Sequence, residues 1–224
     1  MKHHETLNVN LETQNRLLTP HFALNEFTES PTARKHGIAN VPPAEAVDNL
    51  KRLCENTLEP LRETLQLPVV ITSGFRTKAL NDILAHASER SQHMAGQAAD
   101  FYVGEGPVSG SKIQNCPSGE SAHARDNSSK LGSPLAQSQT SSDLQLETGE
   151  SSLKPETPRQ RLIRAFRLII TSEQIDYDQL ILYPTFIHVS YVSKEKNRRT
   201  ILLGMRNGKL GYGKCSIKNA LTIV

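Results

Sequence analysis

The sequence predicts an α+β fold, a small and mostly antiparallel sheet with flanking helices, interrupted by a long disordered insertion. Two segments, 44–65 and 159–172, carry apolar residues at the helical period of 3.6. Several shorter runs are rich in β-branched or aromatic residues, which is typical of strands. The stretch 104–158 is polar and shows neither pattern. Together these observations predict one interrupted domain over residues 19–203.

The elements before the insertion follow from short sequence signals. Residues 1–18 are polar and predict a flexible leader, and His21–Ser30 resembles a short docking element that ends in a turn. The first helix is expected at 44–65, with a kink at Pro60 inside it. The remaining elements of this half are a strand at 68–72, a turn at 73–77, a helix at 78–85 and a strand at 98–103.

After the insertion the chain is predicted to return to helix and sheet. The helix at 159–172 is amphipathic, so we expect one side of it to face the core. Two strands, 178–183 and 186–192, follow it, and 200–203 predicts a further edge strand. Residues 204–224 are assigned to a C-terminal tail.

The polar stretch 104–158 contains twelve Ser, six Gly and five Pro, and it lacks Phe, Tyr and Trp. Such a segment cannot bury enough apolar surface to offset the entropy of ordering, so we predict that it is disordered. It is either an insertion between two halves of one domain or a linker between two domains. Candidate metal ligands on both sides of it, described next, favour the insertion.

Composition narrows the functional classes. The formal charge of +3 suits an anionic polymer such as a cell wall but is too small to indicate nucleic-acid binding. Trp is absent and aromatic residues make up 5%, which argues against a stacking platform for single strands. No apolar run approaches the length of a membrane span, and the N-terminus lacks the apolar core of a signal peptide. We therefore expect a monomer that is cytoplasmic as synthesised and reaches a cell wall only if delivered.

The cysteines do not form a recognisable site. Cys54, Cys116 and Cys215 are odd in number and widely spaced, and no CxxC pair occurs. A disulfide framework and a cysteine-based zinc site are therefore not expected, and the thiols are predicted to be free.

The run SQHMAGQAAD, residues 91–100, is the most informative in the chain. His93 and Asp100 can face one point if a turn at Gly96 leads into a strand, and both are zinc donors. His188, in the apolar run FIHVSYV, is placed on a neighbouring strand to give a third donor. Three protein ligands leave a fourth position for water, as catalytic zinc requires. Spacing alone leaves open whether His93 and His188 are ligands or hydrogen-bonded core residues.

Four motifs in order, SGFRT, ALN, SQHMAGQAAD and FIHVSY, resemble the zinc D-alanyl-D-alanine carboxypeptidase family of cell-wall peptidases. The resemblance covers about residues 19–103 and 159–200, and it implies Zn²⁺ held by His93, Asp100 and His188. It further implies that Arg76 holds the substrate near its scissile carbonyl. Residues beside these motifs are expected to contact the substrate, namely Ser73, Ser91, Gln92 and Tyr183.

The general base is the weak point of the resemblance. Many relatives have a Glu or Asp three residues before the third ligand, where this chain has Thr185, which cannot accept a proton. We nominate Asp178, one of the nearest acids, as a catalytic residue. The alternative is that Asp178 is a surface residue at the start of a strand.

The resemblance implies a zinc metallopeptidase that hydrolyses peptidoglycan stem or cross-link peptides, as a carboxypeptidase or an endopeptidase, with a zinc-bound water as nucleophile. The alternative is a non-catalytic zinc module that binds cell wall or a protein partner. The missing carboxylate near His188 favours this alternative, as does the likeness of the family's scaffold to the hedgehog signalling domain. A structural domain without metal is the third interpretation.

Overall fold

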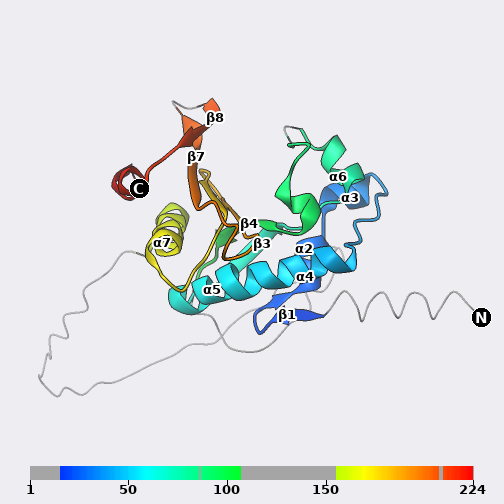
Figure 1. Cartoon of the computed structure of the whole chain (residues 1–224), viewed down its shortest axis with the longest axis horizontal. Helices are drawn as coiled ribbons and strands as arrows, with labels where there is room; N and C mark the ends of the chain where they lie inside the picture. The colour runs from blue at the N-terminus through cyan, green and yellow to red at the C-terminus, as the bar shows by residue number, and fades with distance from the viewer. Residues whose placement is uncertain (1–15, 86, 107–154, 207–208, 224) are drawn as a thin grey trace, which may run out of the picture. The chain divides into compact units, whose positions relative to one another are not determined.

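The computed structural model describes residues 16–85, 87–106, 155–206 and 209–223 (Figure 1). Residues on both sides of the long gap belong to one compact unit, 1–108 with 156–224. A second unit, 109–155, lies outside the described residues apart from Pro155, so the predicted disorder of the insertion is not addressed. No helix among the described residues is long and apolar enough to cross a membrane.

The α+β class is confirmed, and the main sheet is larger than predicted and mixed. It contains six strands in the order β3-β4-β6-β5-β7-β8, in which every neighbouring pair is antiparallel except the parallel pair β5 and β7. Its strands are β3 Val69–Ser73, β4 Ala98–Val103, β5 Gln179–Leu182, β6 Ile187–Ser190, β7 Thr200–Arg206 and β8 Lys209–Lys214. A separate antiparallel pair consists of β1 Leu17–Thr19 and β2 Phe22–Ala23.

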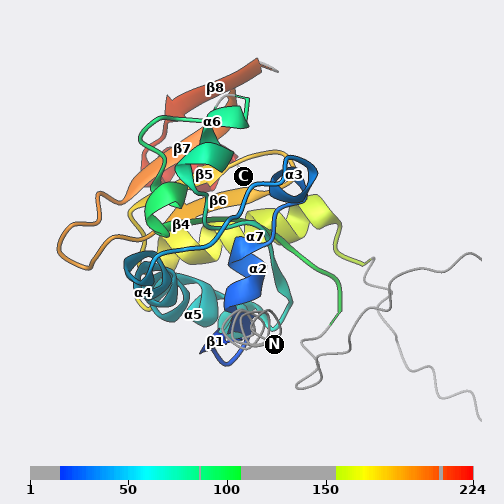
Figure 2. The same ribbon diagram turned by 90° about the vertical axis from the view of Figure 1, so that its right-hand side faces the viewer.

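The helices lie on both sides of the main sheet (Figures 1 and 2). Strand alternation directs Phe101 of β4 and Val189 of β6 into the core, against the buried faces of the long helices. The opposite face is therefore free to carry polar side chains. The helices are α2 Leu24–Thr28, α3 Pro31–Lys35, α4 Ala44–Leu53, α5 Glu59–Leu65, α6 Lys78–Ile83, α7 Pro158–Thr171 and α8 Ile217–Ile223.

Pro60 perturbs the first long helix one turn before its own position. The segment Cys54–Leu58 between α4 and α5 is a π-helical turn. Proline has no backbone N–H and cannot donate to the carbonyl of Asn56, four residues earlier. That carbonyl instead accepts a hydrogen bond of 2.9 Å from the backbone N–H of Asp176. The predicted kink is thus a π-helical turn. Its Asn56–Asp176 hydrogen bond connects the helix to the segment just before β5.

Ordered structure extends beyond the predicted boundaries of the domain. β1 begins at Leu17, inside the stretch assigned to the leader. β7 continues to Arg206 and pairs with β8, so 200–203 is part of an internal strand and the sheet runs into the assigned tail. The alternation of apolar and polar residues is weak after residue 203. β8 is therefore recognised by its pairing with β7 and not by its sequence pattern. Cys54 and Cys215 are free thiols, as expected, and Cys116 lies outside the described residues.

Arg161 on α7 joins the two ends of the insertion. Its buried guanidinium donates to the carbonyls of Val103 and Glu156, which lie on opposite sides of the gap, and pairs with the carboxylate of Glu105 at 3.0 Å. Thr157 then caps α7 by accepting from the backbone N–H of Gln160. These contacts hold the two ends together, and Glu105 and Glu156 lie inside the stretch 104–158 that the sequence predicts to be disordered.

Replacing residues 107–154 by a short Gly-Ser linker is expected to leave folding and zinc binding intact. The contacts that fix both ends remain, and loop length changes the free energy of unfolding only weakly, by about 1 kcal/mol. Thermal unfolding and zinc per chain would check this. Loss of the metal in a folded deletion variant would show that the insertion contributes to the site.

Candidate metal centre

Asp100 and His188 are brought together by strand register. They are directly opposed on the antiparallel strands β4 and β6, on the face that points away from the long helices. The side chains of opposed residues lie within about 5 Å of each other at Cβ. Their flanking residues, Ala99 and Val189 among them, are buried in the core, which fixes the orientation of both strands.

His93 reaches the same point from a 3₁₀ turn, Gln92–Ala95, just before β4. Its ring lies 2.7 Å from the carbonyl oxygen of Gly74 through Nδ1, so that nitrogen carries the proton. The Nε2 lone pair is then directed at Asp100 and His188. The carbonyl of His93 also accepts a hydrogen bond from the backbone N–H of Arg76, so the SGFRT and SQHMAGQAAD motifs stabilise each other.

Three ligand atoms converge at this point. His93 Nε2 lies 3.2 Å from His188 Nδ1 and 3.4 Å from an Asp100 carboxylate oxygen, and the same oxygen lies 2.7 Å from His188 Nδ1. Tetrahedral zinc with bonds near 2.0–2.1 Å needs donor atoms about 3.3 Å apart. Two imidazoles and one carboxylate therefore fit zinc in kind and nearly in spacing. Among the described residues, this is the cluster of His, Cys, Asp and Glu that could hold a metal ion.

The protonation states also suit a cation. Burial lowers the pKa of His93, which is 3% exposed, so its ring is neutral at pH 7. Burial raises the pKa of Asp100, but interactions with His93 and His188 outweigh this and hold that pKa far below its ordinary range. Neutral histidine and ionised aspartate are the forms that bind metal.

Arg76 lies directly beside the three ligands. Its Nη2 donates to the second Asp100 oxygen at 2.9 Å, and Nε and Nη2 both donate to the Ser73 hydroxyl. Arg76 is thus placed beside the candidate ligands by an ion pair with Asp100, and its substrate-holding role stays a prediction. Within the described part of the chain no acceptor faces Nη1, which leaves that nitrogen available to a ligand. The Ser73 hydroxyl orients the Arg76 guanidinium. The sequence predicts a different contact for Ser73, one with the substrate.

Residues 20–119 match the family model of Peptidase M15. This match confirms the resemblance to zinc D-alanyl-D-alanine carboxypeptidase-type peptidases, and Peptidase M15 is a family of metallopeptidases. The matched range contains Arg76, His93 and Asp100 but stops before His188. The third ligand therefore rests on the geometry of β6. No curated protein and no solved structure matches the chain.

An open cavity of about 830 Å³ lies over the Peptidase M15 motifs. The three candidate ligands and Arg76 form its polar part, while Ile181, Tyr183, Phe186 and Leu202 line an apolar part. Tyr183 stacks on Phe186 with ring centroids 4.3 Å apart. Ser91 and Gln92 line the cavity too, so three of the four predicted substrate-binding residues border it.

Asp178 is not placed as a general base. It is 1% exposed and is absent from the cavity lining. Its carboxylate accepts from the side chain and backbone of Arg198 and, at 2.9 Å, from Gln92 Nε2. Burial raises its pKa, but these hydrogen bonds outweigh burial and lower the pKa below its ordinary value. Because a base for neutral pH needs a pKa near 7, these contacts favour a positioning role, in which Asp178 holds Gln92, the neighbour of His93, over the predicted catalytic one.

Asp178→Asn is expected to lower the free energy of unfolding at pH 7 by about 1–3 kcal/mol, because charged hydrogen bonds to Arg198 are lost. Since the native pKa of Asp178 is depressed, its stabilisation is complete above about pH 4 and is lost as the pH falls through that native pKa. Urea unfolding of both proteins should therefore converge in acid. Asp82→Asn, which removes an exposed partner of Lys78, should cost less than about 0.5 kcal/mol. An equal cost for both variants would contradict the assignment.

Gly96 ends the turn that carries His93. Its φ is +68°, and a Cβ there would lie 2.3 Å from the carbonyl oxygen of Ala46 on α4. Gly96→Ala therefore adds a backbone clash to left-handed strain and should destabilise by about 2 kcal/mol or more. Gly37→Ala is the matched control, because Gly37 has φ +62° and open space around it. Urea unfolding should show a cost at least about 1 kcal/mol larger for Gly96→Ala, and equal costs would rule out the clash.

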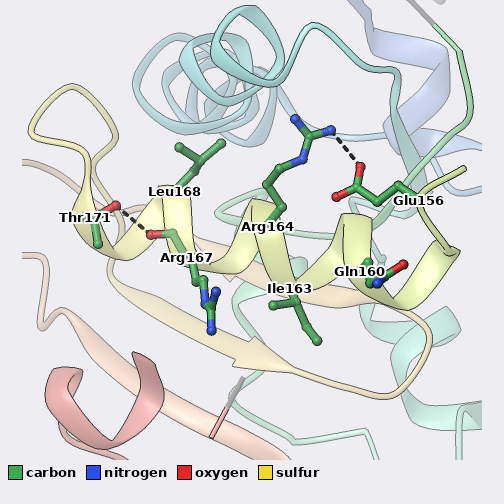
Figure 3. A pocket seen from close by; sticks show the side chains of 7 residues that line it. All are labelled: Glu156, Gln160, Ile163, Arg164, Arg167, Leu168 and Thr171. Atoms are coloured by element: carbon green, nitrogen blue, oxygen red, sulfur yellow. Dashed lines mark hydrogen bonds and ion pairs between the residues drawn. The ribbon is translucent and has the colours of Figure 1, made fainter. Parts of the chain in front are cut away.

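A second hollow, of about 430 Å³, lies along α7 (Figure 3). Its lining includes Glu156, which pairs with Arg164 at 3.0 Å, and otherwise residues of α7 itself. It contains no histidine, cysteine or hydroxyl with an adjacent base, so it offers no catalytic arrangement. The metal centre is therefore the candidate functional site.

Proposed function

We propose that this chain is a zinc-dependent peptidase that hydrolyses the stem or cross-link peptides of peptidoglycan. The observation that carries the proposal is the convergence of His93, Asp100 and His188 beside Arg76 in an open cavity. The Peptidase M15 match supports a peptidase, and the fit of the donor set supports zinc.

The side chains divide the work as follows. When bound by the three ligands, zinc supplies Lewis-acid activation of water and of a peptide carbonyl. Arg76, a fixed cation with one free nitrogen, would stabilise negative charge on the carbonyl oxygen or bind a terminal carboxylate. Ser73 holds Arg76 in place. The Tyr183 and Phe186 rings would cover the apolar parts of the peptide and exclude water.

The second candidate function is a zinc-containing module that binds cell wall or a protein without cleaving it. Among the described residues that line the cavity, Asp100 is the single carboxylate, and it is assigned to the metal. Thr185, where many relatives have an acid, lies in an exposed turn between β5 and β6. This candidate keeps the metal ligands but dispenses with the proton acceptor. The likeness of the family's scaffold to the hedgehog signalling domain supports this second candidate.

Zinc-loaded full-length protein incubated with purified peptidoglycan tests the two candidates. The peptidase proposal expects new amino groups over time, with none released by His93→Ala or in the presence of a chelator. Wall sedimentation in the same samples measures binding. Binding without release of amino groups would sink the peptidase and favour the module, whereas neither binding nor release would sink both.

We propose that the protein works as a monomer, because all three candidate ligands come from one chain. Size-exclusion chromatography with light scattering would check the monomer.

A further inference from the structure

The cavity over the metal centre carries an excess of positive charge. Three arginines line it, Arg76, Arg90 and Arg198, against the single carboxylate of Asp100. Asp178 offsets Arg198 from behind, so the fixed side chains leave one net positive charge, and bound Zn²⁺ would add two more. A cavity with this balance attracts a ligand that carries more than one negative charge.

Arg198 is held in one orientation at the rim of the cavity. Its Nε and Nη2 atoms face the Asp178 carboxylate, and Nη2 also lies 3.3 Å from the Gln92 side-chain oxygen. The Asp178 end of this pair is buried, but the Arg198 side chain is 57% exposed. No acceptor within the described ranges faces Nη1 of Arg198. A guanidinium fixed in this way loses little entropy when it binds a carboxylate.

Arg90 supplies a second cation in the lining of the same cavity. It is exposed and stands two residues before Gln92, which Arg198 contacts. Its side chain forms no ion pair with any described residue. Arg90 is therefore not needed to hold the fold, and its charge is free to act on a ligand.

We propose that Arg198, assisted by Arg90, is the specificity-determining residue that binds a free side-chain carboxylate of the substrate peptide. Arg76 then serves the carbonyl or terminal carboxylate at the metal, and Arg198 serves a second acid farther along the peptide. This assignment rests on the proposed function in that the ligand is a wall peptide. It adds that peptides with free side-chain carboxylates are selected over their amidated counterparts.

Two synthetic stem peptides test the assignment. They are identical, with a free C-terminus, except that the side-chain carboxylates are free in one and carboxamides in the other. Calorimetric titration into zinc-loaded full-length protein should give about tenfold or more tighter binding of the acid form, because charged hydrogen bonds are lost with the amide. Arg198→Gln should bring the ratio of the two affinities close to one, and Arg198→Lys should restore part of it.

The ratio of affinities does not depend on how much of a variant is folded, which matters because Arg198→Gln leaves Asp178 without its cation. Arg90→Gln is a second variant, and it breaks no ion pair with a described residue. It should lower the ratio of the two affinities by a smaller factor than Arg198→Gln. Arg199→Gln is the matched control, because Arg199 pairs with Asp176 and does not line the cavity. Its ratio should equal that of the wild type.

The outcomes separate this assignment from the peptidase proposal. Equal binding of both peptides by the wild type, or an unchanged ratio in Arg198→Gln and Arg90→Gln, would overturn the assignment even if both peptides are cleaved. Preference for the acid form without cleavage would support the assignment and count against the peptidase. If neither peptide binds, both fail.

Discussion

His188→Ala is expected to abolish stoichiometric zinc binding and, with it, any peptidase activity. His188 supplies one of three donor atoms, and its Nδ1 lies 3.2 Å from His93 and 2.7 Å from Asp100. Loss of a residue that only hydrogen-bonds to a metal ligand lowers metal affinity by about 10–100-fold, so loss of a ligand itself should cost about 100-fold or more. The effect has added meaning because His188 lies after the insertion, whereas His93 and Asp100 lie before it. It therefore tests whether both halves of the chain build one site.

Elemental analysis after gentle purification measures this effect. The wild type should carry about one zinc per chain, and His188→Ala should carry close to none at an equal helix and strand content by circular dichroism. His36→Ala is the control, since His36 is exposed at the end of α3 and belongs to no metal cluster. Full zinc occupancy in His188→Ala would refute the shared site, and an apo wild type that binds no added zinc would favour the domain without metal.

The candidate ligand set could be predicted because each of its residues lies in a short segment with its own signal. The seven-residue spacing of His93 and Asp100 works only through the turn at Gly96, and Gly96 has the left-handed backbone that such a turn needs. His188 was located by the alternation of a strand, and its register against Asp100 followed from pairing of β4 with β6. Local patterns were enough because the fold needed only to place these strands side by side.

The role of Asp178 could not be predicted in the same way. A carboxylate near the site predicts a base when only sequence distance is known. Its actual partners are Gln92, 86 residues earlier, and Arg198, 20 residues later, in a loop without periodicity. The same reason explains why Arg198 was missed. Hydrogen-bond partners of a buried acid depend on the packing of loops, and no spacing rule in one sequence encodes that packing.

The sheet extends farther along the chain than the predicted last strand, 200–203. The end of β7 and all of β8 lie in a run with four glycines and several charges, from Gly204 to Lys214, and such a composition predicts poor strands. β7 is nevertheless stabilised from the other side by its parallel pairing with β5, from Gln179 and Thr200 onward. A buried neighbour can thus impose a strand on a sequence with low intrinsic preference.

Arg76→Gln is expected to lower kcat/KM by about 100–1,000-fold while leaving zinc content unchanged. The guanidinium contributes no ligand atom, so the metal is retained. What is lost is a fixed donor beside the reacting carbonyl, and removal of one such donor in other hydrolases costs about 2.7–4 kcal/mol of transition-state stabilisation. The loss should appear in kcat as well as KM if Arg76 acts on developing charge, and mainly in KM if it only binds a terminal carboxylate.

Arg76→Lys separates geometry from charge. Lysine keeps the positive charge but cannot donate to Ser73 and Asp100 at once in the planar arrangement of Arg76. A loss almost as large as in Arg76→Gln would therefore identify the fixed guanidinium as the active feature. Arg34→Gln, at an exposed ion pair on α3, should leave both constants unchanged. If Arg76→Gln keeps full activity with bound zinc, the metal and its three ligands carry the chemistry alone, and Arg76 serves only to orient Asp100.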